Sequence, residues 1–268
     1  MNEIKKIAEN LIMGLPIVRS FTCQLLINQA SYKQHGTGIF VNIGSKYFLF
    51  TAAHVLDDIE KIFIPMENGE TLLKPGGQII KNTINGDREN DDLDVGILVL
   101  DKDTICDLRE DYCFLNENQI GLNHIPIDFH SYLVFGYPTT MSKKSISRNS
   151  FHTIPFFNFT KCVSKETYKK INRQDVFNLV VAYDRKNIPN LKSKTISFGP
   201  NLFGISGCGL WFVNPYIINE KPKLIGIMNE WSKLNKSLLI ATRIDAYTEV
   251  LRKYNIIDFP ESDLFSFS

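Results

Sequence analysis

The feature that most constrains the fold of this chain is its long series of short apolar runs. Gly, Asn, Asp and Pro bound these runs and supply turns between them. In chain order the runs are IVRSFTCQLLI, TGIFVNIG, KYFLFTAA, KIFIPM, LDVGILVL, SYLVFGY, VFNLVVAY, GLWFV, KLIGIMNEW and SLLIATRI. Many short strands without intervening helices predict an all-β barrel or sandwich. A helical bundle or a doubly wound sheet would need more helix.

Two helices are expected, one near each end of the sequence. The segment EIKKIAENLIMG predicts a short amphipathic helix that Gly14 and Pro16 stop. The segment RIDAYTEVLRKYN has helical spacing and predicts a helix near the C-terminus. No internal repeat and no low-complexity linker separates the runs between them, so we expect a single domain.

Composition limits the classes of function. The 268 residues carry a net charge of +1, which points to no particular partner. The stretch LIMGLPIV is too short to span a bilayer, and MNEIKKIAEN lacks the order of a secretory signal. Five cysteines are widely spaced, with no CxxC pair and no HExxH. We therefore expect a cytoplasmic protein with free thiols, no metal, no cofactor and no membrane contact. The richness in Lys, Asn and Ile is compatible with an AT-rich bacterial genome.

One region, residues 139–195, is polar and strongly basic. Its basic residues include Lys143, Lys144, Arg148, Lys161, Lys165, Lys169, Lys170 and Arg173. We interpret it as a solvated insertion between strands. The alternative is a docking surface for an acidic protein or a nucleic acid. Aromatic residues interleave with the charges, but no nucleic-acid-binding motif accompanies them.

The stretch FGISGCGLW, residues 203–211, places three glycines around Ser206. Glycine is costly in conformational entropy and is used where the backbone turns tightly or approaches something closely. One interpretation is a plain turn between two strands. The other is a nucleophile held on a bend, with backbone N–H groups turned toward a developing negative charge.

A serine nucleophile needs a base, and the base needs a carboxylate that fixes its tautomer. Among the five histidines His54 stands out, because it ends an apolar strand after two small alanines. Asp94 opens the apolar run LDVGILVL, at the edge of the core, where a buried carboxylate must be paired. A structural histidine and an aspartate that merely ends a loop are the alternatives.

The order of these candidates along the chain is His54, Asp94, Ser206. No histidine follows Ser206, so the α/β-hydrolase order of Ser, acid, His is excluded for this serine. No aspartate precedes His54, so the subtilisin order of Asp, His, Ser fails as well. The order His, Asp, Ser remains, which is the chymotrypsin order.

On these residues the sequence resembles the trypsin-like (chymotrypsin-fold) serine peptidases, in the group that includes bacterial intracellular enzymes. The motifs GTGIFV, TAAH, LDVGILVL and FGISGCGLW match those of the family in the correct order, and the resemblance extends over about residues 21–254. It implies two six-stranded antiparallel β-barrels with short N-terminal and C-terminal helices. The implied parts are the N-terminal helix at 1–15, the first barrel at 16–120, the second barrel at 121–242 with the basic insertion 139–195, and the C-terminal helix at 243–254.

The resemblance also implies a role for each site residue. His54 is the general base, Asp94 orients it and Ser206 attacks the substrate. The backbone N–H groups of Gly204 and Ser206 form the oxyanion hole. Asn229 falls where the family often places a small polar residue that supports the aspartate.

Two positions depart from the family pattern. Ile205 replaces the acid that secreted trypsin-like enzymes pair with a freed N-terminus, and no Ile-Val-Gly-Gly activation site appears. Cys208 stands where many members have glycine, and we interpret it as a small buried filler rather than a second nucleophile. We therefore expect no activation by N-terminal cleavage, and control by loop ordering or by a regulatory protein partner.

The resemblance further implies a substrate pocket, whose residues are Pro200, Asn201, Asn229, Glu230, Leu239 and Ala241. Pro200 and Asn201 would form its base, and Leu239 and Ala241 its far wall. None of these four is charged, which favours an apolar or small side chain before the cut. Glu230 would instead favour Lys or Arg if it points inward.

We therefore expect a serine endopeptidase that hydrolyses peptide bonds in a specific protein substrate through an acyl-enzyme, in bacterial defence or a stress response. One alternative is a peptidase-like binding module without turnover. Another is a protease whose basic insertion binds nucleic acid. The presence of all three catalytic residue types, together with the glycine framework, favours the active enzyme.

Overall fold

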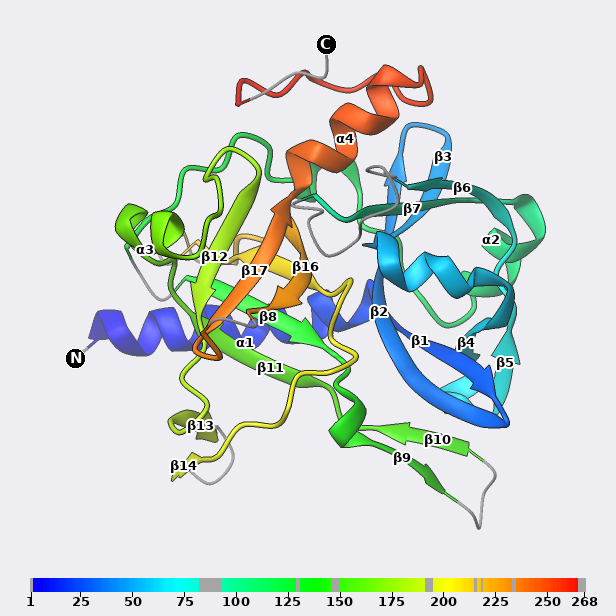
Figure 1. Ribbon diagram of the computed structural model, residues 1–268, viewed down its shortest axis with the longest axis horizontal. Coiled ribbons are helices and arrows are strands. Elements are labelled where there is room, and N and C mark those ends of the chain that lie inside the picture. Colours follow the sequence, from blue (N-terminus) through cyan, green and yellow to red (C-terminus); the bar gives the residue numbers. More distant parts are fainter. Residues whose placement is uncertain are drawn as a thin grey trace.

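Two curled antiparallel β-sheets form the body of the molecule (Figure 1). The computed structural model describes residues 2–81, 93–128, 131–145, 150–190, 195–214, 216–217, 219–232 and 235–264. Within these residues the first sheet has seven strands, in the spatial order β5 (Thr71–Leu73), β4 (Ile62–Met66), β1 (Thr22–Gln29), β2 (Ser31–Ile43), β3 (Lys46–Ala52), β7 (Val95–Leu100) and β6 (Gly77–Lys81). The second sheet has six, in the order β11 (Phe156–Thr160), β8 (Tyr132–Gly136), β15 (Gly209–Phe212), β16 (Lys223–Trp231), β17 (Leu238–Arg243) and β12 (Asn178–Ala182).

This architecture confirms the predicted all-β fold with two curled sheets. In the described chain the first sheet carries one strand more than the six expected. The additional strand is the short β5, which pairs antiparallel with β4 directly after a single turn of 3₁₀-helix, η2 (Glu67–Gly69). The second sheet has the expected number of strands.

The two sheets are held together by an apolar cluster that both of them share. Successive side chains of a strand point to opposite faces. In β2, Phe40 therefore packs into the core of the first barrel, while its neighbours Ile39 and Val41 pack into the shared cluster. Phe135 and Trp211 of the second sheet complete that cluster. Burial of these fully or nearly fully enclosed side chains fixes the position of one barrel against the other.

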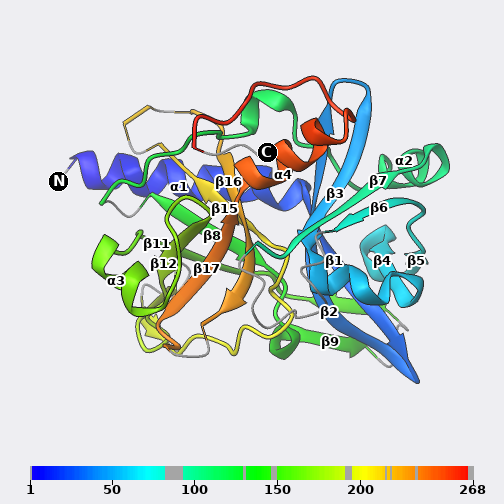
Figure 2. The ribbon, with the colours of Figure 1, turned by 45° about the horizontal axis from the view of Figure 1, so that its top comes forward.

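The N-terminal helix α1 (Asn2–Ser20) is longer than the sequence predicted, and the predicted stop at Gly14 and Pro16 is wrong. Gly14 is buried, and a Cβ there would lie 2.9 Å from Cγ of Pro222, so this glycine serves a close contact. Val18 is fully buried in the shared cluster. Tertiary packing of this kind outweighs the low helix propensity of glycine and proline. The helix lies along the second sheet and reaches β1 at its end (Figures 1 and 2).

The basic region 139–195 is only partly an insertion. It supplies β11 and β12, the two outer strands of the second sheet, so the interpretation as a solvated insertion is wrong for these strands. The strand β12 lies within the predicted run VFNLVVAY, whereas β11 was not predicted. In β11 buried and half-buried residues alternate, but two of the three buried ones are the polar Asn158 and Thr160, so burial in this strand does not follow the alternation of polar and apolar residues. The remainder forms the hairpin β9 (Ser142–Ser145) and β10 (Ser150–Thr153), the helix α3 (Lys165–Lys170), and the pair β13 (Ile188–Asn190) and β14 (Thr195–Ser197). Arg148 of this region lies outside the described residues.

Two further helices each follow a strand, α2 (Lys102–Leu108) after β7 of the first sheet and α4 (Ile244–Lys253) after β17 of the second. Helix α2 is capped by Asp101, whose carboxylate accepts from the N–H of Thr104 at 2.9 Å. Helix α4 lies close to the predicted 243–254. No helix in the described part of the chain is long and apolar enough to cross a membrane.

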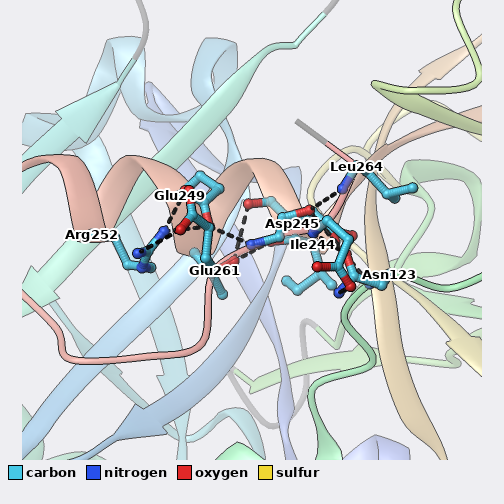
Figure 3. Close-up of polar contacts among 10 residues, drawn as sticks. Asn123, Ile244, Asp245, Glu249, Arg252, Glu261 and Leu264 are labelled. Carbon is cyan, nitrogen blue, oxygen red and sulfur yellow. Dashed lines mark hydrogen bonds and ion pairs between the residues drawn. The ribbon is translucent and has the colours of Figure 1, made fainter. Parts of the chain in front are cut away.

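Helix α4 is fastened by the segment that follows it (Figure 3). The N–H of Ser262 donates to Glu249 at 2.8 Å, and its hydroxyl donates to Asp245 at 2.9 Å. The N–H of Asn123 also donates to Asp245, at 2.8 Å. Arg252 pairs with Glu249 at 2.7 Å. Asp245 and Glu249 are buried acids, so this segment stabilises the helix by donating hydrogen bonds to carboxylates that would otherwise be costlier to bury.

Acid stability is expected to depend on His124. Burial, and to a smaller extent the charge of Arg243, lowers the pKa of His124 from 6.5 to about 4. The folded protein binds a proton on His124 more weakly than the unfolded chain does. The contribution of neutral His124 to the free energy of unfolding is therefore present above pH 6.5 and is lost as the pH falls toward 4. His124→Gln should flatten that decline, by up to about 3 kcal/mol. Urea unfolding of the wild type and the variant from pH 8 to pH 4 measures this change in the free energy of unfolding. Equal slopes over the acid range would contradict the prediction.

Candidate active site

His54 is positioned by the end of a buried strand. β3 ends at Ala52, and a 3₁₀-helix, η1 (Ala53–Lys61), begins at the next residue. Ala52 and Ala53 are fully buried, while the side chain of His54 is 40% exposed. The N–H of Ala53 donates to the carbonyl of Asp94 at 2.9 Å, and Ala52 pairs with Val95 in the sheet. Register between β3 and β7 therefore brings the histidine and the aspartate to the same edge.

Asp94 contacts His54 through both of its carboxylate oxygens. Oδ2 lies 2.6 Å from Nδ1 of the ring, and Oδ1 accepts from the backbone N–H of His54 at 3.0 Å. An ionised carboxylate only accepts, so the proton of the neutral ring resides on Nδ1. The other ring nitrogen, Nε2, is then an acceptor and can take a proton. This contact holds the His54 ring in one orientation, and the role of His54 as a base stays a prediction.

The aspartate sits on an unusual backbone conformation. Asp94 has φ +44°, in the left-handed region that Asp and Asn tolerate better than most residues. Its preceding residue is anchored, because the hydroxyl of Thr242 donates to the carbonyl of Leu93. Asn229 in turn donates from Nδ2 to the Thr242 hydroxyl oxygen at 3.0 Å. Asn229 thus reaches the aspartate segment through Thr242, a residue that the sequence reasoning missed. The signal available was a threonine within the apolar run SLLIATRI.

Ser206 lies on a loop that is hydrogen-bonded to strands of both barrels. The N–H of Thr37 in β2 donates to the carbonyl of Ser206 at 2.8 Å, and the N–H of Gly207 donates to the carbonyl of Met228 at 2.7 Å. Gly207 has φ +88°, and a Cβ on it would lie 2.0 Å from the Thr37 carbonyl and 2.0 Å from the Thr51 hydroxyl. Thr51 precedes His54 by three residues. The glycine framework therefore lets the serine approach the strand that carries the histidine.

The peptide bond between Phe203 and Gly204 is oriented by a hydrogen bond from Thr139. The carbonyl of Phe203 accepts from the N–H of Thr139 at 2.7 Å. In a trans peptide the C=O and N–H point in opposite directions, so the N–H of Gly204 points away from Thr139. Gly204 has φ +85°, a conformation that glycine adopts without steric cost. Among the residues that the structure describes, the N–H groups of Gly204 and Ser206 donate no hydrogen bond. Both are available to a ligand oxygen.

No hydrogen bond joins the Ser206 hydroxyl to His54 within the described residues. In unliganded sites such bonds are often long and tighten only when substrate is bound. His35, on the adjacent strand β2, has its pKa lowered mainly by burial, so it adds no positive charge beside His54 at neutral pH. Complete burial raises the pKa of the Cys208 thiol far above its usual range, which makes this cysteine a poor nucleophile.

The pocket residues implied by the resemblance have several different environments. The carbonyl of Pro200 accepts from the Tyr183 hydroxyl at 2.8 Å, and that of Asn201 accepts from Thr140 at 3.0 Å. Leu239 and Ala241 have no exposed surface and belong to the core of the second barrel.

Glu230 is paired with a cation from the basic region. Its carboxylate lies 2.6 Å from Arg173, and both side chains are largely buried. The next residue on β16, Trp231, contacts the exposed ring of Phe203 edge-on, with centroids 6.0 Å apart. The charge of Glu230 is therefore compensated by Arg173.

Tyr247 supports the histidine strand from the far side. Its buried hydroxyl donates to the carbonyl of Thr51 at 2.7 Å. Tyr247→Phe should destabilise the fold by about 1 kcal/mol, because a buried carbonyl loses its side-chain donor. Tyr254→Phe is the matched control, since Tyr254 is 64% exposed. Urea unfolding measures both variants, and equal midpoints would contradict the prediction.

Comparison with known proteins gives a match by structure. No protein-family model matches the chain, and no curated protein sequence does. The crystal structure of the serine endoprotease from Yersinia pestis matches with a TM-score of 0.51 and 14% sequence identity, over 90% of this chain and 64% of that chain. This chain therefore spans less than two thirds of that protein. The likeness shows that the fold is a chymotrypsin-like double barrel.

Proposed function

We propose that this protein is a serine endopeptidase that cleaves a protein substrate through His54, Asp94 and Ser206. The observation that carries the proposal is the double contact of Asp94 with the ring and the backbone of His54. That contact leaves Nε2 as a base on the strand edge against which the Ser206 loop packs. The N–H groups of Gly204 and Ser206, which donate no hydrogen bond to any described residue, support the same reaction.

The reaction follows from these positions. Ser206 Oγ attacks the carbonyl carbon of the scissile peptide, and its proton passes to Nε2 of His54. Asp94 stabilises the imidazolium, and the N–H groups of Gly204 and Ser206 stabilise the oxyanion. The C–N bond then breaks, and the leaving amine takes the proton from His54. Water, deprotonated by His54, attacks the acyl-enzyme and releases the acid, and the proton returns to Ser206.

For specificity, we propose an apolar or small side chain before the cut. The pairing of Glu230 with Arg173 supports this, because a compensated carboxylate attracts Lys or Arg weakly. A cytoplasmic location in a bacterium, in defence or a stress response, and control by a protein partner remain part of the proposal. They rest on composition and on the family resemblance.

Labelling by a fluorophosphonate probe, read by intact mass, tests the function. The wild type should gain one adduct, Ser206→Ala none, and His54→Ala far less. Cys208→Ala is the matched control and should label like the wild type, because its thiol is buried and protonated. No adduct on the wild type would favour the binding module without turnover. An adduct that persists in Ser206→Ala would refute the assigned nucleophile.

A further inference from the structure

A cleft of about 540 Å³ opens on a part of the molecule that contains none of the three proposed catalytic residues. Its walls come from the end of α1, from β1, from η2, from the loop after α2 and from β10. These elements belong to both barrels and to the N-terminal helix. In Figure 1 the end of α1 meets β1 on the side of the molecule where the β9–β10 hairpin projects. The proposed function gives this cleft no role.

The charges that line the cleft are not paired with one another. Arg19 lies in the last turn of α1, and Glu67 and Asp111 lie on other walls. The N–H of Glu67 donates to Asp111 at 2.6 Å, which holds the two acidic residues together. In the described ranges, no ion pair joins Arg19 to a carboxylate, and none joins Glu67 or Asp111 to a cation. A ligand with one basic and one acidic group complements this arrangement.

Side-chain hydrogen bonds connect one wall of the cleft to Gly204 in the loop before Ser206. Gln24 lines the cleft and donates from Nε2 to Thr153 at 2.7 Å and to Gln34 at 2.8 Å. Gln34 donates from its own Nε2 to the carbonyl of Gly36 at 2.5 Å and to that of Gly204 at 3.3 Å. A ligand that displaces the amide of Gln24 would therefore disturb a group that contacts Gly204.

A second wall reaches the same glycine through the backbone. Tyr137 lines the cleft, and its N–H donates to the Thr37 hydroxyl at 3.2 Å. That hydroxyl donates to the carbonyl of Gly204 at 3.3 Å. Two residues beyond Tyr137, the N–H of Thr139 holds the Phe203 carbonyl. Movement of Tyr137 would thus act on both peptides that flank Gly204.

We infer that this cleft binds a short zwitterionic peptide segment, and that its occupant sets the orientation of the Gly204 peptide. The carboxylate of the peptide pairs with Arg19, and its ammonium group pairs with Glu67 and Asp111. The binding site stands on its own, whereas its effect on catalysis rests on the proposed endopeptidase function. Such coupling arises when the affinity of the cleft for the peptide differs between two arrangements of the loop that contains Gly204.

Binding is tested on Ser206→Ala, so that no activity is needed. Glycine oligomers of increasing length serve as probes, because each carries only a terminal ammonium group and a terminal carboxylate. Titration is followed by calorimetry and by amide NMR. We expect one length to bind best, and its N-acetylated and C-amidated forms to bind more weakly. Arg19→Ala and Glu67→Gln should each weaken binding about fivefold, and Lys46→Ala, an exposed lysine outside the cleft, should not.

Coupling is read in two ways. In Ser206→Ala the amide resonance of Gly204 should shift as the best oligomer saturates the cleft. In the wild type the same oligomer should change the rate of fluorophosphonate labelling by at least about fivefold. Both effects should need about fivefold more oligomer in Arg19→Ala.

Each negative outcome has a distinct meaning. Absence of binding by every oligomer, or binding that Arg19→Ala leaves intact, would overturn the site. Binding without a shift at Gly204 would overturn the coupling. Normal binding and a normal shift, with no labelling under any condition, would instead refute the proposed function and leave the cleft assignment in place.

Discussion

Asp94→Asn is expected to lower kcat for peptide hydrolysis by about 10⁴-fold while the fold stays intact. Asparagine tolerates the left-handed backbone at this position as well as aspartate does, so φ +44° should be kept. Its amide nitrogen, however, donates where the carboxylate oxygen accepts. If that nitrogen faces Nδ1 of His54, the ring must move its proton to Nε2. A ring protonated on Nε2 cannot take the proton of Ser206.

The measurement is the rate of fluorophosphonate labelling, with circular dichroism and urea unfolding as checks on the fold. Asp58→Asn is the control, because Asp58 lies on the same 3₁₀-helix as His54 and pairs with Lys61 at 3.0 Å on the surface. This variant should label at nearly the wild-type rate. A folded Asp94→Asn protein that labels as fast as the wild type would show that Asp94 does not orient the base.

Gly207→Ala is expected to destabilise the protein by about 3 kcal/mol and to slow labelling by about 10²-fold. Two costs act together. The backbone has φ +88°, which an L side chain rarely adopts, and the new Cβ would lie 2.0 Å from both the Thr37 carbonyl and the Thr51 hydroxyl. Relief of that overlap requires the Ser206 loop to move away from the strand that carries His54.

Gly44→Ala separates the two costs. Gly44 also has a positive φ, +56°, but a Cβ on it would have no atom within 4 Å. This variant should lose about 1 kcal/mol, for the backbone conformation alone, and should label normally. Urea unfolding and labelling of both variants make the comparison. Equal losses in the two would contradict the argument that close approach, rather than backbone strain, makes Gly207 necessary.

Local pattern singled out His54 and Asp94 separately, and the family resemblance predicted that they are neighbours. A polar ring after two alanines and a carboxylate at the start of an apolar run are each readable within a few residues. The glycines around Ser206 could be interpreted from the sequence in the same way, because a backbone with positive φ favours glycine. The catalytic role of these residues stays a prediction.

The supporting residues could not be read in this way. Thr242 contacts Leu93 across 149 positions of sequence, and Tyr247 contacts Thr51 across 196. A single threonine or tyrosine inside an apolar run signals burial but not a partner. Only the folded arrangement of the two barrels brings these hydroxyl groups to the strand edge.

The errors at α1 and in the basic region have one cause. Gly14 and Pro16 ordinarily favour the end of a helix, and the many basic residues of the region 139–195 ordinarily favour a solvated loop. In both places, packing against a neighbouring element outweighs the local preference. Local rules are weakest where one face of an element is covered by chain that lies far away in sequence.

The long-range hydrogen bonds of Thr242 and Tyr247 have a consequence during synthesis. The histidine and aspartate strands leave the ribosome long before the residues that brace them. At a synthesis rate of about 5–20 residues per second, several seconds pass between synthesis of the first barrel and addition of Thr242 and Tyr247. Until residue 206 has been added, the nascent chain contains His54 and Asp94 but not Ser206. Under the proposed function, such an unfinished chain cannot yet cut the proteins around it.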